Sequence, residues 1–356
     1  MRRSKLRFSL LTAAVALLVF LVLLLSTLSG ALISALIGAV EGLNAQGLVY
    51  TDTARDNIAA SRLEPTAVES VARIPGVAEA SGIGTFTTTT EVGGESLDLQ
   101  LFGFVPEAPG APTGLSEGRL PAAVGEVAVD GTALGVGDEA TILGVPVTVV
   151  GLLNGAQLNA LPTVYMTIGD YEAMVTAANP GLPFVPLNAV AFNVEKGADP
   201  SSVADAITAG NDGLIGYTLE AAVAKIPGIE SITQSFGILV GLTFVIAIVV
   251  IGFFFLILTV QKMRVFTLLR AVGASAPSLS GAVALQIVVV VVIASLIAVG
   301  LTLLALAGLS TGIPVRLNAT LIVGTVIAVL IFSLLAGLLS IRRIARIDPA
   351  SAVGAR

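Results

Sequence analysis

Few side chains in this sequence could do chemistry. Cysteine and histidine are both absent from its 356 residues. Histidine is the commonest general base and metal ligand, and cysteine supplies disulfides and thiolate ligands. The sequence therefore excludes a Ser-His-Asp triad, a disulfide framework and a zinc site with histidine or cysteine ligands. No GxxxxGK[ST] segment occurs either, so the chain has no P-loop for a nucleotide.

Carboxylates, phenols and thioethers are the side chains left for catalysis or ligand binding. The acids are spread along the chain rather than paired, which is typical of a solvated acidic surface. We expect most of the phenol and thioether side chains to pack in a hydrophobic core. The residues in question are Tyr50, Tyr165, Tyr171, Tyr217, Met166 and Met174.

Composition indicates an integral membrane protein. Hydrophobic residues make up 55% of the chain and charged residues 12%, with a mean hydropathy of +0.96, whereas soluble proteins average about 25% charged. The charges are also segregated. Residues 41–230 hold 23 acids and six bases, a net charge of −17, and the rest of the chain holds 12 bases and one acid, a net charge of +11. We expect membrane lipid, and no nucleic acid, among its partners.

Four charge-free runs, of 33, 31, 45 and 25 residues, exceed the roughly 20 residues that a transmembrane helix needs. The first is longer than the roughly 7–15-residue core of a signal peptide, so we expect an uncleaved anchor. No span contains an ionisable side chain, which argues against an ion-coupled transporter or channel. The predicted segments are an N-terminus at 1–8, transmembrane helix 1 and stalk at 9–40, an outer domain at 41–230, transmembrane helix 2 at 236–260, a loop at 261–280, transmembrane helix 3 at 281–308, an outer loop at 309–319, transmembrane helix 4 at 320–341 and a tail at 342–356.

The basic residues predict the orientation of the spans, because Lys and Arg concentrate on the cytoplasmic side. The N-terminus, the loop at 261–280 and the tail together hold eleven bases and one acid. We therefore expect both termini in the cytoplasm and residues 41–230 outside it. Arginine outnumbers lysine by 14 to four, with abundant alanine, glycine and valine, which points to a GC-rich bacterium and so to its cytoplasmic membrane.

Small residues recur at one-turn spacing in the first two spans. Such stripes let helix backbones approach closely, since packing drives helix association in lipid. The alternative is that small residues are simply common in membrane helices. The predicted helix-packing residues are Ser26, Gly30, Ser34 and Gly38 in the first span and Gly237 and Gly241 in the second.

The segment 41–230 alternates strand and helix signals, so we predict an α+β domain. Gly93-Gly94 separates two β-rich runs and predicts a hairpin, and Asp199-Pro200 predicts a helix start. The fold class is thus a membrane α-helical protein with four transmembrane helices (one plus three) and an inserted extracytoplasmic α+β domain. Predicted strands are 82–92, 96–105, 126–130, 140–143, 145–152, 163–167 and 189–194, and predicted helices are 65–74, 168–178 and 200–209.

The segment after the second span predicts a short amphipathic helix. Val265, Leu268, Leu269 and Val272 follow the i, i+3, i+4, i+7 spacing of an apolar stripe. Gly273 is a predicted helix end. Such a helix could fit a groove in a cytoplasmic partner, or it could be only the basic end of the second span lying at the membrane interface.

Three stretches resemble one family. Residues 262–275 are similar to the K-x-R…L-L-R-A-x-G-A-S loop of FtsX-like permeases, the MacB family (type VII) of ABC transporter membrane subunits. Residues 118–138, with G-R-L-P, G-E-V-A-V-D and L-G-V-G-D, resemble its outer domain, and 346–350 resembles its R-x-D-P ending. The chain departs from the family at Val265, where an acid is frequent, and at Val353-Gly354, where Leu-Arg is usual.

The resemblance implies a MacB-like periplasmic core domain and a non-catalytic membrane subunit. It implies a homodimer, or a heterodimer with a related permease, and two copies of a separate ABC ATPase. ATP and magnesium would bind that partner, so we expect no cofactor on this chain. Its long first and second helices would transmit motion outward. The residues expected to contact the ATPase are Lys262, Arg264, Leu268, Leu269, Arg270 and Gly273.

The main hypothesis is export or extraction of a lipophilic or amphipathic substrate at the outer leaflet; family cargoes include drugs, peptides, lipoproteins and haem. Haem could be held only by tyrosine, methionine or carboxylate side chains, and its ligands stay unassigned. The alternative is an FtsX-type signalling scaffold that activates an extracytoplasmic partner such as a cell-wall hydrolase. A third hypothesis is a membrane-anchored binding module without an ATPase. The basic amphipathic segment at 261–275 favours the first two.

Overall fold

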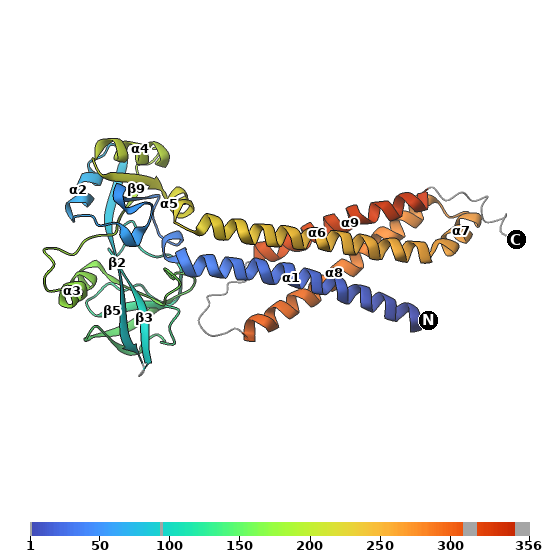
Figure 1. Cartoon of the computed structure of the whole chain (residues 1–356), viewed down its shortest axis with the longest axis horizontal. Coiled ribbons are helices and arrows are strands. Elements are labelled where there is room, and N and C mark those ends of the chain that lie inside the picture. The colour runs from blue at the N-terminus through green and yellow to red at the C-terminus, as the bar shows by residue number, and fades with distance from the viewer. Residues whose placement is uncertain (1, 93–94, 309–318, 346–356) are drawn as a thin grey trace. The chain divides into compact units, whose positions relative to one another are not determined.

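The computed structural model describes residues 2–92, 95–308 and 319–345 (Figure 1). The chain divides into two compact units. Among the described residues, a membrane unit comprises 2–29, 234–308 and 319–345, and an outer unit comprises 30–233. The outer unit thus begins before residue 41, where the sequence places the start of the outer domain.

Long apolar helices build the membrane unit. They are α1 (Arg2–Glu41), which also enters the outer unit, α6 (Ile229–Gln261), α8 (Ala276–Gly308) and α9 (Ala319–Ala345), with the short α7 (Met263–Ala271) between α6 and α8. In the described residues, three segments are long and apolar enough to cross a membrane, and a fourth apolar segment in α9 is shorter. They are Ser9–Glu41, Ile229–Ile257, Pro277–Leu306 and Ile322–Leu335.

One-turn periodicity determines which face of each helix is buried. On α1 the buried side chains include Leu11, Val15, Val19 and Leu23, each four residues from the next. Residues four apart lie on one face of a helix. These side chains share one core cluster with residues of α6, α8 and α9. The four-helix membrane arrangement predicted from hydropathy is therefore confirmed as a packed bundle.

The start of α8 differs from the sequence expectation. The predicted span begins at 281, but the helix begins at Ala276. The hydroxyl of Ser275 accepts the amide of Ser278 at 3.4 Å, which caps the helix. Pro277 then falls in the first turn, where its missing amide costs nothing. The predicted outer loop at 309–319 and the tail at 342–356 fall mostly outside the described residues.

The outer unit contains a ten-stranded mixed sheet. The strand order is β10-β1-β9-β2-β3-β8-β5-β7-β4, with β6 paired to β7. The strands are β1 (Gly47–Thr51), β2 (Val77–Val92), β3 (Glu95–Phe104), β4 (Leu115–Gly118), β5 (Glu126–Asp130), β6 (Glu139–Ile142), β7 (Val145–Leu153), β8 (Thr163–Thr167), β9 (Ala189–Val194) and β10 (Leu214–Thr218). The helices are α2 (Thr66–Ala72), α3 (Ile168–Ala178), α4 (Pro200–Gly210) and α5 (Leu219–Lys225), with 3-10 turns at Asp52–Ala54 and Ile58–Ala60.

The long strand β2 joins two halves of the outer unit. Its residues Val77 to Ile83 pair with β9, and its residues Gly84 to Val92 pair with β3. Figure 1 shows α2 and α4 beside β9 in one half and α3 beside β3 and β5 in the other. Each half has its own hydrophobic cluster. A third cluster includes residues of β1, β2, β3, β8 and the end of α1. It takes the alternate residues of the strands, such as Tyr165 between Val164 and Met166, and so lies on the opposite face of the sheet.

Most predicted elements of the α+β domain are confirmed. The bounds of α3, β5, β8 and β9 match the predicted ranges. Asp199 caps α4 by accepting the amide of Ser202 at 3.0 Å, with Pro200 as the first helical residue. β2 and β3 are antiparallel with Val92 opposite Glu95, as a hairpin requires, although Gly93 and Gly94 lie outside the described residues.

Candidate functional site

The predicted amphipathic helix is present as α7, separated from α6 by one residue. Its last turn ends in a left-handed Gly273 with φ +106°. The amide of Ala274 bonds to the carbonyl of Leu269 at 2.9 Å, which is the six-to-one bond of a Schellman helix end. The predicted helix end at Gly273 is therefore confirmed, and α7 is a helix distinct from the second span.

The side chains of α7 divide into one buried anchor and an exposed apolar stripe. Phe266 is 8% exposed and belongs to the same buried cluster as Leu279 and Val283 of α8. The rest of the chain leaves the stripe uncovered, and Leu268 is 63% exposed. Such an uncovered apolar stripe can contact a partner protein or the membrane interface. The exposed stripe consists of Val265, Leu268, Leu269 and Val272.

The basic residues of this segment are only partly described. The ammonium of Lys262 donates to the side-chain oxygen of Gln286 on α8 at 3.0 Å. This hydrogen bond fixes the turn between α6 and α7 against α8, so one of the bases expected to contact an ATPase also has a partner within the chain. The side chains of Arg264 and Arg270 lie outside the described residues, and their contacts stay a prediction.

The phenol and thioether side chains pack mostly in the core, as predicted. Tyr50, Tyr165, Tyr171, Met166 and Met174 are buried. Burial raises the pKa of all three of these phenols, so they stay protonated. In the part of the chain that the structure describes, no group of three or more Asp or Glu side chains could hold a metal ion. The buried phenol and thioether side chains therefore have a structural role in the core.

The motif region 118–130 forms a polar clasp on the outer unit. Arg119 binds Glu126 through both guanidinium nitrogens, one of them at 2.7 Å. The amides of Ala122 and Ala123 donate to the same carboxylate, each at 3.1 Å. The Arg119 hydrogen bonds, with the two amides, lower the pKa of Glu126 to about 2. The clasp ties β4 to β5, so this motif is explained by folding.

The small residues predicted to pack helices have different surroundings. A side chain added at Gly30, Gly237 or Gly241 would meet nothing within 4 Å. Packing of these positions, and of Ser26 and Ser34, on another helix stays a prediction for a second subunit. Gly38 differs, because an added Cβ would lie 2.2 Å from the carbonyl oxygen of Gly155 in the outer unit.

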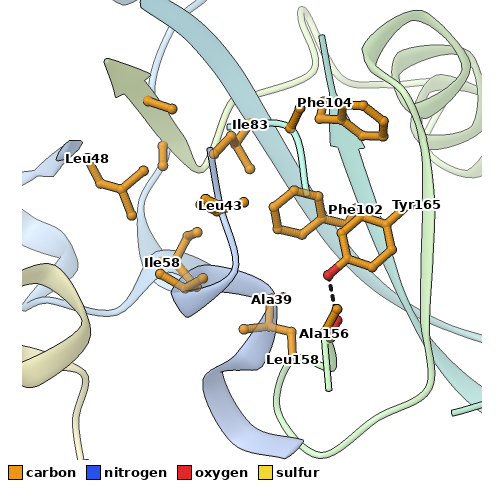
Figure 2. Close-up of a cluster of buried hydrophobic side chains, with 14 of the residues drawn as sticks. Ala39, Leu43, Leu48, Ile58, Ile83, Phe102, Phe104, Ala156, Leu158 and Tyr165 are labelled. Carbon is orange, nitrogen blue, oxygen red and sulfur yellow. Dashed lines mark hydrogen bonds between the residues drawn. The ribbon is translucent and has the colours of Figure 1, made fainter. Parts of the chain in front are cut away.

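The end of α1 is part of the core of the outer unit (Figure 2). Figure 2 shows Ala39 and Leu43 among Ile58, Ile83 and Phe102. Ala39, Val40 and Leu43 are buried there. The backbone is also fixed: the amide of Asn44 bonds to Ala111 at 2.8 Å. The first membrane helix therefore ends as a component of the outer unit.

A second attachment of α1 was missed from the sequence. The β7–β8 connection, residues 155–160, hydrogen-bonds to the backbone of α1. In the sequence this segment reads as a polar turn, G-A-Q-L-N-A, with no apolar periodicity to predict a partner. The buried anchor Phe266 was missed as well, because it lies off the apolar stripe that defines α7.

These features define a class: a membrane subunit with several apolar helices, a large domain inserted after the first, and a short exposed amphipathic helix after the second. Two family models match the chain, a MacB-like periplasmic core domain over residues 8–209 and the FtsX-like permease C-terminal region over residues 237–349. The chain belongs to the FtsX-like family of ABC transporter permeases and carries a MacB-like periplasmic core domain. Permeases of this family are non-catalytic membrane subunits.

Individual relatives agree with this family. An uncharacterized ABC transporter permease of Mycobacterium tuberculosis is 26% identical over 287 residues, covering 80% of this chain and 77% of that one. A permease of Staphylococcus haemolyticus whose name assigns it to hemin transport is 29% identical over 111 residues, 31% of this chain and 32% of that one. The crystal structure of the periplasmic region of MacB from Actinobacillus actinomycetemcomitans aligns with 51% of this chain and 92% of that one, with 11% identity and a TM-score of 0.38.

Proposed function

We propose that this permease couples ATP hydrolysis by a separate ABC ATPase to movement of its outer domain, and thereby exports or extracts a lipophilic or amphipathic substrate at the outer leaflet. Two copies of the permease, or one with a related permease, would assemble with two ATPase subunits. Both termini and α7 would face the cytoplasm of a bacterial cell, and the outer unit would face the opposite side of its cytoplasmic membrane.

The observation that carries the proposal is the exposed stripe of α7. The helix is held to the bundle by Phe266 and by the Lys262–Gln286 hydrogen bond, while Leu268 and its neighbours are uncovered. A helix fixed on one side and apolar on the other fits a groove in a partner protein. The segment 261–280 holds three bases and no acid, which supports a cytoplasmic partner.

The length of α1 supports transmission of motion rather than a pore. Its 40 residues correspond to about 60 Å of helix, against a hydrocarbon core of roughly 30 Å. The end of that helix is a component of the outer unit's core. A movement of α1 driven from the cytoplasm would therefore reach the sheet directly, without a substrate path through the membrane.

Haem is one candidate cargo, because the name of the staphylococcal relative assigns that protein to hemin transport. The buried phenols and thioethers are unavailable for surface ligation, so a haem cargo would need other contacts. A haem titration without a Soret change would remove it from the candidates. An FtsX-type scaffold would use the same α7 and α1, and it differs in having no transported substrate.

The experiment that tests the proposal measures co-purification of a partner ABC ATPase with the permease. We expect Leu268→Asp with Arg270→Glu to abolish co-purification of the ATPase. The matched control is Val124→Asp with Arg73→Glu, the same charge changes at exposed positions of the outer unit, where Val124 is 91% exposed. Co-purification that survives the α7 variant would contradict the docking role.

A milder substitution at Leu268 gives an expected change in the Kd for the ATPase. Burying a Leu side chain fully is worth roughly 1.5–3 kcal/mol, and Leu268 is 63% exposed before docking. Leu268→Ala should then cost about 1–2 kcal/mol, roughly 5–30-fold in Kd. Leu304→Ala is the control, since Leu304 is 72% exposed on α8 and should leave the Kd unchanged.

A further inference from the structure

The loop between β7 and β8 is bonded to α1 backbone to backbone. We call residues 155–160 the clamp loop. The amide of Ala39 donates to Gln157 at 2.9 Å, and the carbonyls of Leu36 and Ala35 accept the amides of Asn159 at 2.9 Å and Ala160 at 2.8 Å. Three backbone hydrogen bonds thus connect the last turns of the first membrane helix to one loop.

Gly38 is what allows the loop to approach so closely. An added Cβ would lie 2.2 Å from the Gly155 oxygen and 2.9 Å from its carbonyl carbon. Those atoms are backbone and cannot rotate away. At Gly30, two turns earlier on the same helix, nothing lies within 4 Å of an added Cβ. The close contact is therefore a local property of position 38.

The other side of the clamp loop is held by buried polar groups of the sheet. The carboxylate of Asp130 on β5 accepts the amide of Ala156 at 2.5 Å, and the hydroxyl of Tyr165 on β8 donates to the carbonyl of Ala156 at 2.5 Å (Figure 2). The hydroxyl of Thr163 accepts the amide of Leu158 at 3.0 Å. A continuous hydrogen-bonded path therefore runs from α1 through the loop to β5 and β8.

The loop holds an unfavourable backbone conformation in order to make these bonds. Asn159 and Ala160 both adopt φ +57°. A left-handed conformation is unfavourable for a residue with a side chain, more so for alanine than for asparagine, and such conformations persist where the surrounding structure fixes them. Both residues use this geometry to direct their amides at α1. The clamp is thus specified in detail rather than a chance contact.

We propose that the Gly38–clamp loop contact is the positioning contact through which movement of α1 reaches the sheet of the outer unit. The inference rests on the proposed transmission of motion and identifies where in the fold the transmission occurs. Gly38 acts through Gly155 and Ala156 on β5 and β8. If Gly38 had a purely structural role, the outer unit would need only to stay folded. The orientation of α1 relative to the sheet of the outer unit would not have to be fixed.

The test compares Gly38→Ala with Gly30→Ala. Because the chain has no cysteine, nitroxide labels can be placed at Leu32→Cys on α1 and Val124→Cys on the outer unit, both at exposed positions. In the assembled complex we expect a narrow Leu32–Val124 distance distribution in the parent and in Gly30→Ala, and a broadened or shifted one in Gly38→Ala.

The change in label distance on ATP binding distinguishes failure of the positioning role of Gly38 from failure of the proposed transmission of motion. Labels at Val124 of both permease copies should change distance between the nucleotide-free and ATP-trapped complex in the parent and in Gly30→Ala, and this change should be lost in Gly38→Ala while the ATPase still co-purifies. A Gly38→Ala variant with the parental distribution and full response overturns the positioning role alone. A parent with no nucleotide response overturns transmission of motion and, with it, this inference.

A second variant tests the positioning role in case Gly38→Ala fails to fold. Asn159→Gly with Ala160→Gly adds no atoms and accepts the left-handed conformation without strain, but it loosens the clamp loop. We expect the same broadening and a reduced nucleotide response with the outer unit folded by circular dichroism. A rigid, fully responsive double-glycine variant would overturn the positioning role.

Discussion

Two buried tyrosines give opposite predictions for the same chemical change. Tyr165 and Tyr50 are both fully buried in the outer unit. The hydroxyl of Tyr165 donates to the carbonyl of Ala156 at 2.5 Å. Within the part of the chain that the structure describes, the hydroxyl of Tyr50 is buried without a hydrogen-bond partner. Substitution by phenylalanine keeps each ring and removes only the hydroxyl.

The magnitude follows from what each hydroxyl leaves behind. Tyr165→Phe removes a hydrogen bond and leaves a buried carbonyl less well satisfied, so it should destabilise the outer unit by about 1–3 kcal/mol. The ring contact with Phe102, at a centroid distance of 4.9 Å, is unchanged. Tyr50→Phe removes a buried polar group that has no partner, and should be neutral or stabilise by up to about 1 kcal/mol.

Hydrogen exchange of the full chain in detergent micelles measures both effects locally. The amides of Ala156 and Leu158 should exchange about 5–150-fold faster in Tyr165→Phe, the equivalent of about 1–3 kcal/mol. Tyr50→Phe should leave their protection unchanged. Parental protection in Tyr165→Phe, or a loss in Tyr50→Phe as large as in Tyr165→Phe, would refute the hydrogen-bond reasoning.

Two further predictions concern pH and topology. Arg119 lowers the pKa of Glu126 to about 2. The clasp therefore stabilises the fold fully above the unfolded pKa of about 4.5, and that stabilisation is lost as pH falls toward 2. In an acid titration of stability, Glu126→Gln should remove this part of the acid dependence, and an unchanged acid dependence would contradict the prediction. Cysteine placed at Val124 should react with an impermeant maleimide on intact cells, whereas cysteine at the exposed Val272 should react only after lysis; the reverse pattern would overturn the orientation.

Elements with complete local signals could be predicted from the sequence. β8 is an apolar run between a proline-containing turn and a helix cap. Thr167 caps α3, because its hydroxyl accepts a hydrogen bond from the amide of Asp170. Their bounds were predictable because start, stop and periodicity agree. β1 and β10 were missed although they are no shorter than β5 and β8. Each is a strand mainly through its pairing with the other and, for β1, with β9. Such pairings are not encoded locally.

The α7 surface was predictable for the same reason. Its apolar stripe, its basic neighbours and its glycine end lie within fifteen residues of sequence, so one amphipathic pattern contains all of them. What the pattern could not show is which face the bundle covers. Phe266 decides this, because an aromatic side chain buried with α8 turns the stripe outward. The exposed stripe is thus a consequence of tertiary packing as well as of periodicity.

Gly38 shows why a small-residue pattern alone leaves its partner undetermined. The spacing Ser26-Gly30-Ser34-Gly38 predicts a helix face that another backbone can approach. A glycine allows any backbone, of a helix or of a loop, to approach closely. At Gly38 the approaching backbone is a loop. Gly30 remains open to a second subunit. The pattern therefore does not identify the partner: at Gly38 it is a loop of the outer unit, and at Gly30 packing on another helix stays a prediction.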